Sequence, residues 1–262
     1  MGDTAIIGYY TQKRTGVRCR FSPLTQVQYA KPPVQAIFFD IGDTLVFDTP
    51  PLQERLRIAF RAMGLDVSVE RLKDAFRAGE IYAVGQYLIG VPWDDPEALA
   101  EAVTRILQAM EMPLTDTAPL LKNFLNIPFE RCVHPDASTL LADLKARGFI
   151  LGAISDWEVT LPKLLKEWGI SPYLDALAVS EIVGVTKPNV LLFEDALQQV
   201  SVAPENALHI GDWYELDVAG ARTAGMQTLL FDWAGRRPYA DCPRVTTFEE
   251  LSAYLFEHAP VG

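Results

Sequence analysis

Acidic, hydroxyl and basic side chains follow short apolar runs at four places in the 262-residue chain. In chain order these groups are Asp40 with Asp43, Ser155 with Asp156, Lys187, and Asp212 with Asp217. Clustered carboxylates repel one another unless a cation or protons lie between them. Oxygen ligands favour a hard cation such as Mg²⁺, which usually takes one or two carboxylates together with water and substrate phosphate. If the four groups meet in space, their residue types therefore predict a Mg²⁺-dependent phosphate site.

Each residue type has its own use in such a site. A carboxylate can attack phosphorus directly, as in enzymes that form an aspartyl phosphate, and Asp40 is the natural nucleophile. Lys187 and the hydroxyl of Ser155 can hold the remaining phosphate oxygens. Mg²⁺ and Lys187 would offset the repulsion between the anionic nucleophile and the anionic phosphoryl group. The residues thus favour phosphoryl transfer through a covalent intermediate.

The apolar runs that carry these groups favour strands of a parallel sheet. Five such runs cover residues 35–41, 149–155, 176–180, 207–211 and 227–231. None alternates polar with apolar residues, which is typical of strands covered on both faces. Helical patterns lie between them, with Asn189 as a cap and Gly148 and Gly225 as stops. We therefore expect an α/β fold with a doubly wound parallel sheet, whose carboxyl strand ends gather the four groups at one edge.

Residues 50–130 interrupt this alternation of strands and helices, because they contain four helical patterns and no strand-like run. We expect an all-helical cap subdomain there, inserted into an α/β core formed by residues 34–49 and 131–262. An insertion at this point belongs to the edge of the sheet where ligands bind, so a lid over the site is expected. The alternative is a helical subdomain that only enlarges the core.

The order of the four motifs resembles the haloacid dehalogenase-like (HAD) superfamily. FFDIGDTL matches the first motif at Asp40, Thr44 and Leu45, and GAISD matches the second at Ser155. Lys187 before proline matches the third motif, and GDWYELDVAG matches the fourth. The resemblance covers roughly residues 34–255 and implies a HAD-like Rossmannoid core, with the inserted helices in the place of a C1-type cap.

The resemblance also implies a role for each matched residue. Asp40 would be the nucleophile, and Ser155, Lys187 and Thr44 would bind phosphate. The implied Mg²⁺ ligands are Asp40, the backbone carbonyl of Gly42, Asp212 and Asp217. Asp217 has a second interpretation, as the cap of the helix that follows it.

Gly42 departs from the family pattern. Most phosphatases of the superfamily carry an Asp two residues after the nucleophile, as the general acid that protonates the leaving alcohol. Glycine keeps the backbone carbonyl but cannot transfer a proton, a contribution typically worth about 10²–10⁴ in rate. Asp43 is the neighbouring candidate, but consecutive side chains of an extended segment point in opposite directions. A leaving group that needs no proton, such as that of an aryl or acyl phosphate, would escape the loss.

Three functions follow from these observations. The first is a Mg²⁺-dependent phosphatase that forms an aspartyl phosphate on a small phosphorylated metabolite. The second is a metal-independent haloacid dehalogenase. It has no need for Asp212 and Asp217 together, and burying two carboxylates without a metal would cost free energy. The third is a catalytically weak HAD-like binding protein, supported by Gly42. The sequence favours the first.

Charge and cysteine content restrict the partners and the compartment. A formal net charge of −11 argues against nucleic acid and anionic membranes as partners. Three cysteines without a CxxC pair predict a reducing, cytoplasmic location and no structural zinc. Residues 1–33 differ, with five basic residues and one acid. This basic N-terminal extension is expected to be poorly ordered or to contact a partner protein, and a transit peptide is the lesser alternative.

Overall fold

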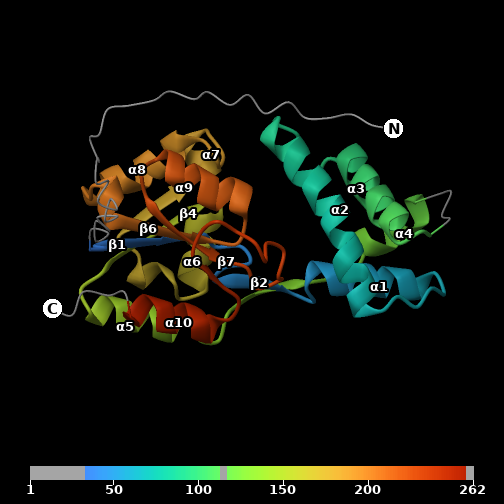
Figure 1. The fold of residues 1–262 in the computed structure, drawn as a ribbon, viewed down its shortest axis with the longest axis horizontal. Helices are drawn as coiled ribbons and strands as arrows, with labels where there is room; N and C mark the ends of the chain where they lie inside the picture. Colours follow the sequence, from blue (N-terminus) through green and yellow to red (C-terminus); the bar gives the residue numbers. More distant parts are fainter. Residues whose placement is uncertain (1–32, 113–116, 258–262) are drawn as a thin grey trace, which may run out of the picture. The chain divides into compact units, whose positions relative to one another are not determined.

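A six-stranded parallel sheet forms the centre of the α/β part of the chain (Figure 1). The computed structural model describes residues 33–112 and 117–257, so the predicted N-terminal extension lies almost wholly outside the described residues. The sheet has the order β5-β4-β1-β6-β7-β8. Its strands are β1 Ala36–Phe39, β4 Ile150–Ser155, β5 Ala176–Val179, β6 Ala207–Gly211, β7 Gln227–Phe231 and β8 Arg244–Val245. The predicted doubly wound parallel sheet is confirmed, and two-residue β8 is too short to leave a pattern in the sequence.

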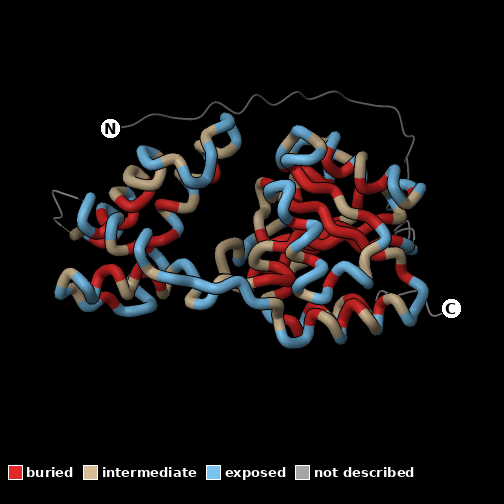
Figure 2. Tube along the Cα trace, turned by 180° about the vertical axis from the view of Figure 1, so that it is seen from behind, coloured by how far each residue is buried: buried red, intermediate tan, exposed pale blue. Residues whose placement is uncertain are grey.

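Helices cover both faces of this sheet, which explains why its strands are apolar throughout. In β1, Ile37 and Phe39 belong to one buried cluster, while Ala36 and Phe38 belong to the other. The first cluster is completed by α5 Ala137–Ala146, α6 Leu161–Glu167 and α10 Phe248–Glu257. The second is completed by α7 Ser180–Val183, α8 Val190–Val200 and α9 Ala219–Thr223. Figure 2 shows the strands as the most continuously buried segments of the α/β part.

Local signals set the ends of several of these helices. The side chain of Asn189 accepts a hydrogen bond from the backbone of Leu191 and so caps α8. Gly148 after α5 and Gly225 after α9 adopt φ values of 87° and 81°, a conformation that glycine reaches without strain. Short irregular turns complete the connections: 3₁₀ turns at Ser171–Tyr173 and Pro204–Asn206, and a π-helical turn, Tyr214–Val218.

A helical insertion follows the first strand of the sheet. It contains α1 Leu52–Ala62, α2 Val69–Leu88, α3 Pro96–Ala109 and α4 Ala118–Leu125. These helices share a buried cluster of their own, which includes Phe60, Leu72 and Phe124. Gly79 lets α2 and α3 approach closely, because a Cβ there would lie 2.7 Å from Ile106. The insertion expected from the helical patterns is therefore present.

An antiparallel ribbon, absent from the sequence-based prediction, carries the chain into and out of the insertion. Its strands are β2 Val46–Thr49 and β3 Glu130–Val133, with Val46 opposite Val133. Each strand has four residues and carries charged side chains, so neither forms an apolar run. Within residues 33–112 and 117–257, no helix is long and apolar enough to cross a membrane.

The contact between Gly152 in β4 and the ring of Phe38 in β1 gives a test of this packing. A Cβ at position 152 would lie 2.5 Å from Phe38 Cδ1. We expect Gly152→Ala to lower the free energy of unfolding by about 1–3 kcal/mol through overpacking, as measured by urea denaturation.

Gly85 in α2 provides the matched control, because a Cβ there meets no atom within 4 Å. Gly85→Ala should raise the free energy of unfolding by about 0.5–1 kcal/mol, the usual gain on replacing a glycine inside a helix. A Gly152→Ala protein as stable as the unmodified chain would contradict the packing.

Candidate active site

The four polar groups meet at the carboxyl edge of the sheet, around a cavity of about 230 Å³. Asp40 follows β1, Ser155 ends β4, and Asp212 follows β6. Lys187 lies in the loop between α7 and α8, and all four residues line the cavity. Each is at most 7% exposed. Parallel strand order therefore assembles one site from positions up to 172 residues apart, as at other sheets of this kind.

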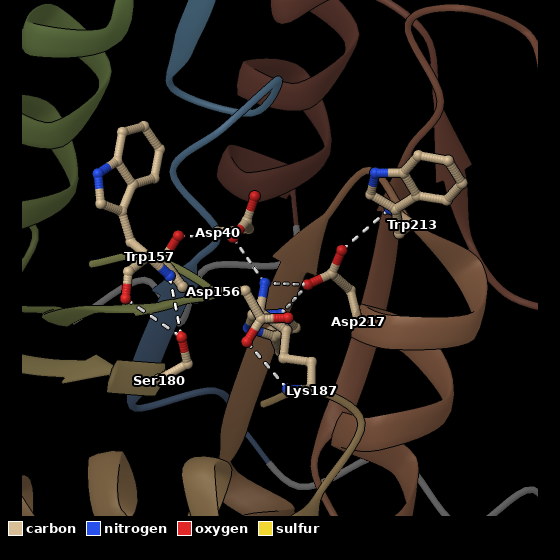
Figure 3. A network of polar contacts seen from close by, with 9 residues as sticks. Asp40, Asp156, Trp157, Ser180, Lys187, Trp213 and Asp217 are labelled. Carbon is tan, nitrogen blue, oxygen red and sulfur yellow. Dashed lines mark hydrogen bonds and ion pairs between the residues drawn. The ribbon is translucent and has the colours of Figure 1, made fainter. Parts of the chain in front are cut away.

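Two donors converge on one oxygen of Asp40 (Figure 3). Ser155 Oγ donates to Asp40 Oδ1 over 3.1 Å, and Lys187 Nζ donates to the same atom over 2.6 Å. Asp40 is itself fixed by its backbone N–H, which donates to the carbonyl of Ile210 over 2.8 Å. Among the described residues no hydrogen bond to Asp40 Oδ2 is found, so that oxygen is left for chemistry.

Lys187 is held between two carboxylates. Its ammonium group also donates to Asp217 Oδ1 over 2.7 Å, and His209 Nε2 donates to that same oxygen over 2.9 Å. Asp217 Oδ2 accepts from the backbone N–H of Trp213 over 2.9 Å, which ties this acid to the residue that precedes the π-helical turn. Both oxygens of Asp217 therefore have protein donors. The cap of the following helix, the second interpretation of Asp217, is not the contact found, because α9 has no side-chain cap; Asp217 instead positions Lys187.

The charges of this network stabilise one another. Burial alone would lower the pKa of Lys187, but the carboxylates of Asp217 and Asp40 outweigh it and raise that pKa. Burial would raise the pKa of Asp217, yet Lys187 and His209 hold it below its usual range. Burial raises the pKa of Asp40, and Lys187 is the largest influence opposing that rise. The lysine is thus a permanent cation, and it favours the carboxylate form of Asp40.

Asp212 is linked to the helical insertion through Arg236. Arg236 Nη1 donates to Asp212 Oδ2 over 2.7 Å, and Arg236 Nε lies 2.9 Å from Glu80 Oε1 on α2. Asp212 is buried and Glu80 is partly buried, and burial raises the pKa of each against the opposing charge of Arg236. No motif marks this arginine, since the GRRP segment after β7 matches none of the four motifs.

The residues present fit a magnesium ion. Asp212 Oδ1 is buried without a hydrogen-bond partner among the described residues, as an oxygen reserved for an absent cation would be. Asp40, Gly42 and Asp212 line the same cavity. In the described part of the chain, no group of three or more His, Cys, Asp or Glu side chains is placed to hold a metal ion. Mg²⁺ suits such a sparse set, because it keeps water and substrate oxygens as further ligands.

The turn at residues 42–43 differs from the extended segment assumed in the sequence argument. Asp43 has a φ of 53°, and its backbone N–H donates to the carbonyl of Val46. Asp43 lines the cavity together with Asp40, so the alternation of neighbouring side chains does not remove it from the site. Burial raises the pKa of Asp43 to about 6, although Arg236 opposes the rise. Gly42 has no positive φ, and a Cβ there would make an ordinary contact of 3.6 Å with the Trp157 ring.

Thr44 is the one predicted site residue that the cavity does not include. It is fully buried, and its Oγ1 has no partner among the described residues. Its assignment to phosphate binding stays a prediction.

Asp156 has a clear structural role, since Oδ1 accepts from the backbone N–H of Lys187 over 2.9 Å and holds that loop in place.

Other cavity residues lie outside the motif positions, and four of them have large aromatic or basic side chains. Trp157 and Trp213 follow motif residues, while Trp93 lies between α2 and α3, and Arg131 lies in β3. Arg131 is held 3.7 Å from Asp48 in the facing strand. No sequence pattern marks Arg131, because β2 and β3 have four residues each and form no apolar run.

Comparison with known proteins agrees with the motifs. The model of the haloacid dehalogenase-like hydrolase family matches residues 34–225. A glyceraldehyde 3-phosphate phosphatase from Methanothermobacter thermautotrophicus is 29% identical over 204 residues, covering 75% of this chain and 85% of that protein. A phosphoserine phosphatase from Thermus thermophilus is 30% identical over 234 residues, covering 78% of this chain and 91% of that protein. The fold is shared with the HAD-hydrolase YfnB from Bacillus subtilis bound to magnesium, at a TM-score of 0.57, 20% identity and coverage of 86% of this chain and 100% of the other.

Replacement of Lys187 by methionine tests the charge balance. Removing one partner of a buried ion pair costs about 3–5 kcal/mol, and we expect a loss of this order in the free energy of unfolding at pH 8. Without the cation, burial should hold the pKa of Asp40 further above its unfolded value, so the deficit grows as the pH rises and shrinks toward pH 5. Urea denaturation at both pH values measures it.

Lys163→Met is the control, because Lys163 is an exposed lysine paired with Glu167 over 3.6 Å on α6. It should change the free energy of unfolding by no more than about 0.5 kcal/mol at either pH. Equal effects of the two substitutions would show that the Lys187 network does not stabilise the fold.

Proposed function

Because the chain belongs to the haloacid dehalogenase-like hydrolases, we propose that it is a Mg²⁺-dependent phosphatase acting on a small phosphorylated metabolite. One observation carries the proposal: Asp40, held through a single oxygen by Ser155 and Lys187, shares its cavity with Asp212. The nucleophile, two phosphate-binding donors and a metal-binding acid are thus supplied by four separate segments at one place.

The reaction proceeds in two displacements. Asp40 Oδ2 forms a bond to phosphorus, while the bond from phosphorus to the leaving oxygen breaks and its electron pair departs with that oxygen. Water then bonds to the phosphorus of the aspartyl phosphate and gives up a proton to solvent. The bond between phosphorus and Asp40 breaks, and its electron pair restores the carboxylate. The departed oxygen takes a proton from solvent, so the products are the alcohol and inorganic phosphate.

The chain's own groups prepare both steps. Ser155 and Lys187 orient Asp40 and offer donors to the phosphoryl oxygens. Asp217 and His209 keep Lys187 in place. Asp40, the carbonyl of Gly42 and Asp212 would hold Mg²⁺. Asp217 would act indirectly, by positioning Lys187. When bound, this ion supplies positive charge that stabilises the phosphoryl group during transfer.

Chemistry and relatives favour a phosphatase over a dehalogenase. Displacement at carbon has no use for the buried acid Asp212, whose Oδ1 lacks a partner among the described residues. The two relatives described above are named as phosphatases of glyceraldehyde 3-phosphate and of phosphoserine, both small phosphorylated molecules. A metabolite-sized phosphate monoester is therefore the proposed substrate.

We further propose a division of the chain and a compartment for it. Residues 34–49 and 131–262 would be the catalytic core, residues 50–130 the cap, and residues 1–33 a basic extension open to protein contact. The free cysteines Cys132 and Cys242 suit the reducing cytoplasm. The acidic net charge argues against nucleic acid and membrane surfaces as partners.

A panel of phosphate esters assayed with Mg²⁺ and with EDTA tests this function. We expect phosphate release with Mg²⁺, its loss in EDTA, and a loss of at least about 10³-fold in Asp40→Asn, because the nucleophile is removed. Asp143→Asn, an exposed acid of α5, should retain full activity. Asp40→Asn activity equal to that of the unmodified enzyme would refute the assigned nucleophile.

Restoring an acid at position 42 tests the consequence of Gly42. Gly42→Asp should raise turnover of alkyl phosphates, with aryl phosphates gaining far less, because protonation matters most for poor leaving groups; the expected gain is about 10–10²-fold. Gly42→Ala, which adds only the Cβ that fits against Trp157, should give no gain. If Asp43 already supplies the proton, Gly42→Asp will change little and Asp43→Asn will lose alkyl phosphate turnover.

A further inference from the structure

Three tryptophans line the same cavity as the nucleophile. Trp157 follows β4, Trp213 follows β6, and Trp93 comes from the helical insertion. Figure 3 shows Trp157 and Trp213 on opposite sides of the Asp40–Lys187 network. None of the three is buried in the manner of a core residue, and Trp93 is 40% exposed. Three partly open indole rings around one cavity provide an apolar, planar surface for a ligand.

Each indole ring is already fixed by a neighbour. Trp93 stacks on Tyr87 at a centroid distance of 4.4 Å and lies 5.8 Å from Trp213. The guanidinium group of Arg131 lies 4.6 Å from the centroid of Trp157. These contacts restrict the rings without burying them, so a ligand would lose little free energy in ordering them.

The size of the cavity limits what it can hold. Its volume is about 230 Å³. A cavity of about 150 Å³ accommodates one benzene molecule, and pockets for drug-sized ligands start near about 300 Å³. The space therefore suits one phosphoryl group together with one six-membered ring.

We propose that the substrate is an aryl phosphate with a single aromatic ring, held against Trp93, Trp157 and Trp213. This inference rests on the proposed phosphatase function and names the substrate class of that site. The ring stacks or packs edge-on against the indoles while the phosphoryl group meets Asp40. Arg131 stands beside Trp157 at the cavity wall, where it adds positive charge near the ring.

Gly42 supports the same substrate class independently of the tryptophans. The phenolic oxygen of an aryl phosphate leaves with the electron pair of its bond to phosphorus and takes a proton from water afterwards. Such a leaving group does not need the acid that Gly42 cannot supply. The tryptophans of the cavity wall and the missing acid at Gly42 thus favour the same substrate, an aryl phosphate.

Matched esters separate ring recognition from leaving-group chemistry. Benzyl phosphate and cyclohexylmethyl phosphate both release an alkyl alcohol, and they differ in the planar ring. We expect KM to be about three- to tenfold lower for benzyl phosphate, the usual scale of an aromatic contact. Phenyl phosphate should exceed benzyl phosphate in kcat. Equal KM values for the benzyl and cyclohexylmethyl esters would overturn the inference.

Substitutions at Trp93 test the residue that is most exposed and hence least needed for folding. Trp93→Leu should raise KM for phenyl phosphate about three- to tenfold with kcat retained, and it should leave KM for glycerol phosphate unchanged. Trp93→Phe, which keeps an aromatic face, should restore most of the affinity. Tyr239→Leu removes an aromatic side chain that is 97% exposed and outside the cavity, and it should change neither constant. A KM for phenyl phosphate unaffected by Trp93→Leu would refute ring recognition.

Binding of phenylphosphonate, which cannot be hydrolysed at its carbon–phosphorus bond, distinguishes this inference from the proposed function. Calorimetry with Mg²⁺ should show phenylphosphonate binding several-fold more tightly than cyclohexylphosphonate, and Trp93→Leu should remove the difference. This preference without any ester hydrolysis would support the aromatic site and refute the phosphatase. Ester hydrolysis without the preference would refute the aromatic site alone.

Discussion

The ammonium group of Lys187, buried between the carboxylates of Asp40 and Asp217, is the interaction on which the site depends. A buried charge is stable only when it is paired and hydrogen-bonded, and here each partner comes from a different segment. Asp40 follows β1, Lys187 follows α7, and Asp217 lies in the π-helical turn after β6. The network therefore holds three loops in one geometry, and Lys187 favours the carboxylate form of Asp40, the proposed nucleophile.

The helical insertion contacts the α/β part through charge and through aromatic rings. Arg236 links Asp212, beside the proposed metal, to Glu80 of α2, while Trp93 lies against Trp213. Phosphate chemistry is assigned to the strand ends, and the insertion contributes to the wall that meets the rest of the substrate. This separation lets one catalytic sheet edge serve many substrates as the inserted residues change.

In the proposed mechanism, Gly42 leaves protonation of the departing oxygen to solvent, because the position has no acid. The position keeps a backbone carbonyl but no acid, and the ring of Trp157 lies next to it. The left-handed turn at Asp43 brings this second carboxyl group to the cavity, whereas the extended segment assumed from the sequence would have turned it away. A leaving oxygen that departs without protonation is consistent with both the missing acid and the aromatic walls.

The sequence by itself determined the parallel sheet, the inserted helices and the polar residues at the strand ends. Each depends on local patterns: continuous apolar runs, helical periodicity, and residue types at fixed positions after a strand. Only the tertiary structure decided that Arg236 pairs with Asp212, that Asp217 holds Lys187, and that Trp93 and Arg131 join the cavity. These contacts link residues far apart in the chain, between short strands and loops without periodicity. Their partners are set by how the elements pack, because no local pattern encodes which distant side chain will meet a buried charge.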